Sequence, residues 1–211
     1  MPHLDQFDFT LDRDGGVILL TLGSDDGMNC LTRRKVAVLT AQILAASSGN
    51  PVLPLVISGE RNFSAGADLN EINVLTGPDA YLFSALGQEL MQAIASYPAP
   101  VIAAIKGHCM GGGLDLALAC HRRIAVPMAV FGHRGAALGM ITGWGGTQRL
   151  PRLLGKARAL ELFVTTEKVT AQRALEIGLI DAIADDPVAE AMVRLGLETI
   201  RQSCRDGAYP V

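Results

Sequence analysis

Short apolar runs alternate along the chain with longer stretches whose apolar residues recur at helical spacing. The longer stretches include residues 32–46 and 79–96, each of which carries one apolar face. The short runs are partly β-branched and are bounded by Gly or Pro, which is typical of buried strands. They are "GVILLTLG" (16–23), "LPLVISG" (53–59), "PVIAAIKG" (100–107) and "RRIAVP" (122–127). The alternation of the two patterns predicts an α/β fold.

Strand patterns become scarce after Pro127, and helical patterns take their place. We expect the last helix to begin after Asp186, with Pro187 in its first position. Helices are predicted at residues 145–154, 156–164, 170–177 and 187–203. We therefore divide the chain into a core at residues 1–185 and a C-terminal helical segment at residues 186–211.

The composition of the 211-residue chain is that of an ordinary globular protein with one hydrophobic core. Its formal net charge of −3 gives no basic excess that would attract nucleic acid. Apolar runs such as 101–105 are too short to span a bilayer, and the N-terminal "MPHLDQFDF" lacks the pattern of a signal peptide. The four cysteines show no paired spacing, and no His and Cys spacing matches a familiar zinc site. The sequence thus predicts a cytoplasmic protein with reduced thiols, no metal site, and neither nucleic acid nor a membrane as a partner.

Three consecutive glycines in "HCMGGGLDLALAC" (108–120) are the strongest chemical signal. They follow a predicted strand and precede a helix that begins near Leu114, so backbone N–H groups point at whatever lies in front of them. A phosphate-binding loop would need Lys and Ser or Thr after its glycines, whereas Leu114 and Asp115 follow here. The remaining interpretation is a pair of N–H donors for an oxygen that becomes negative during a reaction, with Asp115 nearby to move a proton. The turn "FSAGADL" (63–69) is rich in small residues and supplies the second donor.

Four ordered stretches now identify a relationship: "FSAGADL", "PVIAAIKGHCMGGGLDLALAC", "GWGGTQRLPRLLGKARALEL" and "TAQRALEIGLID". Together they resemble the crotonase, or enoyl-CoA hydratase/isomerase, superfamily over residues 17–183. The resemblance implies a crotonase-type spiral of ββα units with a helical C-terminal region, and assembly as a homotrimer or a dimer of trimers. It also implies an acyl-CoA or acyl-carrier thioester as substrate, with coenzyme A as part of that substrate and no further cofactor. By position, the backbone N–H groups of Ala67 and Gly112 would form the oxyanion hole.

The same resemblance assigns further substrate-binding positions. Ala65 and Leu69 would form an adenine-binding turn, and Gly111 lies beside the oxyanion hole. Arg61 either reaches a CoA phosphate or is an ordinary surface arginine. Trp144 either walls the acyl pocket or fills the core, which is the usual place of a lone tryptophan. Two acidic residues in "SDDGMNC" (24–30) would weaken the binding of a polyanion.

The proton-handling positions differ from those of the family's hydratases. Those enzymes place one glutamate two residues after the glycines and a second in a segment like "FGHRGAALG" (131–139). This chain has Asp115 at the first position and Gly135 at the second. Asp115 is either a proton-transfer residue or an acid favoured by the start of its helix. His133 is the nearest substitute for the second group, and its alternative interpretation is a packing histidine.

The sequence therefore predicts a lyase or isomerase of the enoyl-CoA hydratase family that uses an oxyanion hole and an enolate-type intermediate. Two-carboxylate hydration is not expected, because Gly135 has no proton to give. The alternatives are an acyl-CoA hydrolase, a decarboxylase or another specialised crotonase chemistry, and a non-catalytic pseudoenzyme that binds an acyl thioester. Since family members continue with further helices after the equivalent of residues 187–203, we also expect a shortened C-terminal region.

Overall fold

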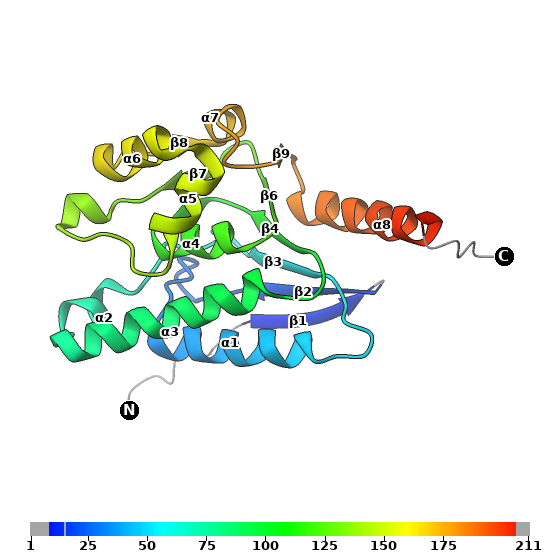
Figure 1. Cartoon of the computed structure of the whole chain (residues 1–211), viewed down its shortest axis with the longest axis horizontal. Helices are drawn as coiled ribbons and strands as arrows, with labels where there is room; N and C mark the ends of the chain where they lie inside the picture. Colours follow the sequence, from blue (N-terminus) through cyan, green and yellow to red (C-terminus); the bar gives the residue numbers. More distant parts are fainter. Residues whose placement is uncertain (1–8, 15, 206–211) are drawn as a thin grey trace.

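The larger of two β-sheets forms the centre of the molecule. The computed structural model describes residues 9–14 and 16–205, with the side chains of residues 16–196. Its strand order is β1-β2-β3-β4-β6-β9 (Figure 1). The first two strands pair antiparallel, and every later neighbour is parallel. The strands are β1 (Phe9–Asp14), β2 (Val17–Leu22), β3 (Leu55–Gly59), β4 (Val101–Ile105), β6 (Arg122–Ala125) and β9 (Ala182–Ile183). All four strands predicted from apolar runs are present.

A second, three-stranded sheet was not predicted. It consists of β5 (His108–Met110), β7 (Val130–Gly132) and β8 (Val169–Thr170) in the order β5-β7-β8. Strands of two or three residues are too short to show a hydrophobic period, so no sequence pattern marked them. Their place in the chain is regular: β4 in the large sheet is followed by β5 in the small sheet and then by a helix, and β6 and β7 repeat this step. The fold is therefore a spiral of ββα turns, as expected.

The predicted helices are present to within a few residues at either end. Thr32 and Thr170 accept hydrogen bonds as N-caps, and Thr76 forms a capping box with Asp79. The Asp186 carboxylate accepts from the first free N–H groups of the last helix. The helices are α1 (Arg33–Ser47), α2 (Leu69–Asn73), α3 (Gly77–Ala95), α4 (Gly112–Ala119), the 3-10 helix η1 (Gly135–Leu138), α5 (Gly146–Leu154), α6 (Lys156–Thr165), α7 (Ala171–Glu176) and α8 (Pro187–Arg205).

Both faces of the central strands are buried, which explains why β3 and β4 read as continuous apolar runs. On one face, Val56, Ile102 and Ile124 pack with Ala191 and Leu195 of α8. The other face carries the main core, against which α1, α3 and α4 pack. Figure 1 shows α8 well apart from the α1 and α3 layer.

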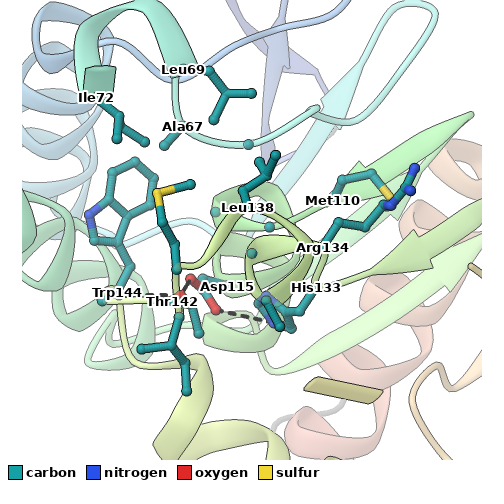
Figure 2. Close-up of a pocket in the computed structure, with 18 of the residues that line it drawn as sticks. Ala67, Leu69, Ile72, Met110, Asp115, His133, Arg134, Leu138, Thr142 and Trp144 are labelled. Atoms are coloured by element: carbon teal, nitrogen blue, oxygen red, sulfur yellow. Dashed lines mark hydrogen bonds and ion pairs between the residues drawn. The ribbon is translucent and has the colours of Figure 1, made fainter. Parts of the chain in front are cut away.

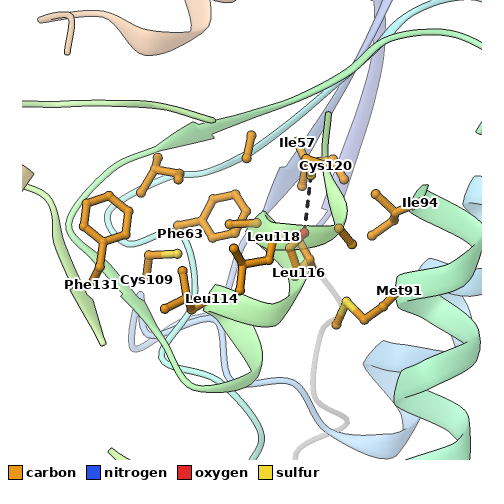
Figure 3. Close-up of a cluster of buried hydrophobic side chains, with 14 of the residues drawn as sticks. Ile57, Phe63, Met91, Ile94, Cys109, Leu114, Leu116, Leu118, Cys120 and Phe131 are labelled. Carbon is orange, nitrogen blue, oxygen red and sulfur yellow. Dashed lines mark hydrogen bonds between the residues drawn. The ribbon is translucent and has the colours of Figure 1, made fainter. Parts of the chain in front are cut away.

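Helix α4 lies inside the main core and is buried from Gly113 to Ala119. Figure 3 shows its leucines between Phe63 and Phe131 on one side and α3 on the other. A helix that is apolar on all sides is stable only where its whole surface is buried, as it is here. The one charged residue of this helix, Asp115, is thereby carried into the interior, at 0% exposure.

Some predictions concern parts of the chain that are not described. Residues 1–8 and 206–211 and the side chain of Cys204 lie outside the described residues, so the N-terminal segment and the end of the C-terminal segment stay predictions. The boundary between residues 185 and 186 also stays a prediction. Cys30, Cys109 and Cys120 are free thiols. Within the described ranges, no helix combines the length and apolar character needed to cross a membrane.

Candidate active site

The turn at residues 64–68 directs one backbone N–H away from its neighbours. The Leu31 N–H donates to the Gly66 carbonyl, and the Asp68 N–H donates to the Leu31 carbonyl. In this parallel bridge the residue between the two bonds, Ala67, has its own N–H on the opposite side. That side faces a cavity.

The Gly112 N–H lies next to the Ala67 N–H. A Cβ added to Gly112 would lie 3.2 Å from the Ala67 nitrogen, and one added to Gly66 would lie 3.0 Å from the Gly112 nitrogen. Gly112 is the first residue of α4, so its N–H has no intrahelical acceptor. Among the described residues, no acceptor takes either N–H. Two free donors therefore lie side by side on one cavity wall.

Each position of the triplet requires glycine for a different physical reason. Gly111 has φ 50° and ψ −120°, a conformation that residues with a side chain rarely adopt. A Cβ on Gly112 would lie 2.5 Å from the Trp144 ring, and one on Gly113 would lie 2.5 Å from the Ser64 carbonyl oxygen. The triplet thus combines a special backbone turn with two close approaches.

The cavity has a volume of about 920 Å³ and is lined mainly by apolar side chains. Its walls come from the 65–75 segment, α3, the start of α4, the 133–144 segment and α6. Among the described residues that line it, Asp115 is the only carboxylate. Ala65, Ala67, Leu69, Gly111, Gly112, His133 and Trp144, all predicted as site residues, line it too.

Asp115 lies between two polar partners, as Figure 2 shows. The Thr142 hydroxyl donates to Asp115 Oδ2, and it accepts a hydrogen bond from the Trp144 N–H at 3.4 Å. Asp115 Oδ1 is 3.5 Å from His133 Nε2, and neither of these two buried atoms has a hydrogen-bond partner in the described part of the chain. The carboxyl group therefore accepts a hydrogen bond at Oδ2 and faces the His133 ring at Oδ1.

Burial controls the protonation of this pair. It raises the pKa of Asp115 to about 7, against the opposing effects of the Thr142 hydroxyl, the Arg149 guanidinium and the Gly146 amide. It lowers the pKa of His133 to about 4. His133 is 4% exposed, and its ring packs on Phe163 with a centroid distance of 5.0 Å. At neutral pH the imidazole is therefore uncharged, and it lies beside Asp115 as a packed neutral ring rather than as an ion-pair partner.

The neighbouring loop explains several features that the sequence left open. A Cβ on Gly146 would lie 2.1 Å from Asp115 Oδ1, so this glycine makes room for the carboxyl group. Gly135 begins η1, and a Cβ there would lie 2.9 Å from the Met140 carbonyl oxygen. Trp144 is both a core residue, at 4% exposure, and a wall of the cavity. Sequence reasoning missed Thr142, because nothing in the local pattern of "GMITGWGG" singles out its hydroxyl.

Arg61 is the one predicted substrate-binding residue that does not line the cavity. It is exposed, and its side chain lies against Gly27, where an added Cβ would be 2.8 Å from Arg61 Cδ. Asp25 and Asp26 are exposed in the same loop. The Ser24 hydroxyl and the Met28 N–H donate to Asp26 and lower the pKa of its carboxyl group. In the part of the chain that is described, no group of three or more His, Cys, Asp or Glu residues is placed to hold a metal ion.

A spiral of ββα turns with two free N–H donors beside a buried carboxyl group defines the class of crotonase-fold proteins. The chain belongs to the enoyl-CoA hydratase/isomerase family, whose model matches residues 12–206. It is 43% identical over 175 residues to a probable enoyl-CoA hydratase of Bacillus subtilis (strain 168). The aligned residues make up 82% of this chain and 67% of that protein.

Solved structures support the same assignment. Pseudomonas aeruginosa DspI superposes with a TM-score of 0.86 and 32% identity, over 91% of this chain and 74% of DspI. The enoyl-CoA hydratase of Bacillus anthracis superposes with a TM-score of 0.85 and 31% identity, over 89% of this chain and 75% of that one. The predicted superfamily is thus confirmed.

Proposed function

We propose that this protein moves a proton at the carbon next to the carbonyl of an acyl-CoA thioester. The thioester oxygen would accept hydrogen bonds from the N–H groups of Ala67 and Gly112, and Asp115 would take the proton. Three features support this proposal: the two free donors share one wall, the cavity is apolar, and Asp115 lies one helical turn beyond Gly112. The proposed step needs no cofactor besides the coenzyme A that the substrate carries.

The two donors matter because removing the proton turns the thioester into an enolate, whose negative charge collects on oxygen. Fixed N–H donors stabilise that charge without reorganisation, and losing one such donor typically costs about 2.7–4 kcal/mol. A carboxyl group with a pKa of about 7 is partly ionised at neutral pH, so it can both accept and return a proton. Its hydrogen bond from Thr142 fixes the direction in which the carboxylate faces.

The single carboxylate favours isomerisation over hydration. Moving a double bond from position 3 to position 2 requires one base, which removes a proton from C2 and returns it at C4. Hydration requires one group to activate water and another to protonate C2, and Gly135 stands where the resemblance to the family's hydratases implies the second glutamate. The observation that carries the proposal is that Asp115 is the only carboxylate among the described residues around the cavity.

Deuterium exchange tests the proposed step directly. We expect the protein in D₂O to exchange the C2 protons of butyryl-CoA, which mass spectrometry measures. We also expect it to convert 3-hexenoyl-CoA to 2-hexenoyl-CoA, which the absorbance of the conjugated product measures. Asp115→Asn should lower both rates by a factor of about 100 or more, while binding of butyryl-CoA persists. Asp185→Asn, a change at an exposed aspartate outside the cavity, is the matched control and should leave both rates unchanged.

Each other outcome has a definite meaning. Release of free coenzyme A would indicate a hydrolase, and loss of carbon dioxide from a carboxylated acyl-CoA would indicate a decarboxylase. Binding without exchange would make the protein an inert thioester binder. Unchanged exchange in Asp115→Asn would remove Asp115 from the reaction.

A further inference from the structure

Trp144 lies between two glycines that belong to different helices. On one side, a Cβ added to Gly87 of α3 would lie 2.1 Å from the indole Nε1 and 2.2 Å from Cδ1 and Cε2. On the other side, a Cβ added to Gly112 of α4 would lie 2.5 Å from Cζ3 and 2.7 Å from Cε3. The indole therefore fills the whole space between the α3 backbone and the start of α4.

The position of the indole is fixed as well as filled. Its Nε1–H donates to the Phe83 carbonyl at 3.3 Å, and its ring meets the Phe83 ring edge to face with centroids 5.3 Å apart. The backbone N–H of Trp144 donates to the Thr142 hydroxyl, which in turn donates to Asp115. The indole thus cannot turn aside without losing its contacts with Phe83 of α3 and its packing against Gly112 of α4.

The six-membered ring borders the two free N–H donors. The point where a Gly112 Cβ would lie is 2.5 Å from indole Cζ3 and 3.2 Å from the Ala67 nitrogen. The indole edge is therefore close to the place that a carbonyl oxygen at the donors would take, where the next carbons of an acyl group can contact it. On the α3 side, the indole contacts Phe83 and the backbone at Gly87.

We infer that the indole of Trp144 closes the acyl pocket at the α3 side and restricts this protein to thioesters of short acyl groups. This inference rests on the proposed function, because it needs the thioester carbonyl at Ala67 and Gly112. Removing the indole opens the space down to the Gly87 backbone, and a longer acyl chain can fill it with apolar contact. Trp144 is thus the residue that determines chain length.

Binding without turnover tests the inference. Calorimetric titration with butyryl-CoA, octanoyl-CoA and free coenzyme A gives the ratio of the dissociation constants for octanoyl-CoA and butyryl-CoA. This ratio should fall at least about tenfold in Trp144→Ala and by less in Trp144→Phe, which keeps a ring in the space. Tyr81→Ala is the matched control, because Tyr81 is an exposed aromatic residue of α3 outside the cavity, and its ratio should equal that of the wild type.

The lone tryptophan of the chain provides a second readout in the unmodified protein. Butyryl-CoA should change the indole emission, whereas free coenzyme A should change it little, because only the acyl group reaches the ring. Gly87→Ala adds a test of opposite sign: its Cβ displaces the indole toward the donors and should weaken butyryl-CoA binding. The same substitution should have no effect on binding in a Trp144→Ala background.

The failures are distinguishable. If the wild type binds none of the acyl-CoA compounds, both the proposed function and the inference fall. If it binds them and Trp144→Ala and Trp144→Phe keep the wild-type ratio, the inference alone is overturned. Normal butyryl-CoA binding by folded Gly87→Ala would also overturn it.

Discussion

Opposite pH dependences of stability are expected from Asp115 and His133. Burial raises the pKa of Asp115 from its ordinary 3.8 to about 7, so between these values the folded state holds a proton that the unfolded state has lost. The Asp115 contribution therefore lowers the free energy of unfolding as the pH rises. Burial lowers the pKa of His133 from 6.5 to about 4, so over that range the unfolded state holds the extra proton. The His133 contribution therefore raises the free energy of unfolding as the pH rises.

The two contributions oppose each other between about pH 4 and 6.5. The folded pair then holds one proton, and the unfolded pair also holds one, on histidine. One pKa unit corresponds to about 1.4 kcal/mol, so each contribution amounts to roughly 3 kcal/mol across this range. In the wild type they cancel, and only variants make them visible.

Three variants separate the two contributions: Asp115→Asn, His133→Gln and the double variant. We expect the free energy of unfolding of Asp115→Asn to rise with pH between about 4 and 6.5, and that of His133→Gln to fall, each by roughly 3 kcal/mol relative to the double variant. Urea unfolding followed by circular dichroism at a series of pH values measures all four curves. Subtracting the curve of the double variant removes the contribution of the other carboxyl groups to the pH dependence. Parallel curves for the two single variants would contradict this prediction, because they would mean that burial does not shift the two pKa values in opposite directions.

Two further predictions concern the same site. Thr142→Val removes the hydroxyl that lowers the pKa of Asp115. The acidic limb of the pH profile for C2 exchange should therefore move to higher pH by about one unit. An unmoved limb would show that the hydrogen bond does not act on the reacting carboxylate. Asp115→Glu combined with Gly135→Glu should add hydration of crotonyl-CoA, provided that the backbone around Met140 shifts to admit the new Cβ; a folded double variant that binds crotonyl-CoA and adds no water would contradict the role assigned to Gly135.

Local patterns in the sequence determined much of the fold. The apolar runs that became β2, β3, β4 and β6 and the helical periods of α1 and α3 reflect burial, which repeats every two or 3.6 residues and is therefore visible in one dimension. Caps such as Thr32 and Thr170 act within three residues, so they too are visible. The glycine triplet and the "FSAGADL" turn marked the two free N–H donors, because backbone exposed to a ligand requires small residues.

Other features depended on contacts between distant parts of the chain. The short strands β5, β7 and β8 are held by their partners, and no period reveals them. Nothing near Gly87 in the sequence indicates that its missing Cβ admits the indole of Trp144, 57 positions later. Likewise, Thr142 and His133 meet Asp115 only because the spiral brings the end of β7 and the loop before α5 against α4. The shifted pKa values follow from that packing, since desolvation depends on what surrounds a group in space rather than on its neighbours in the chain.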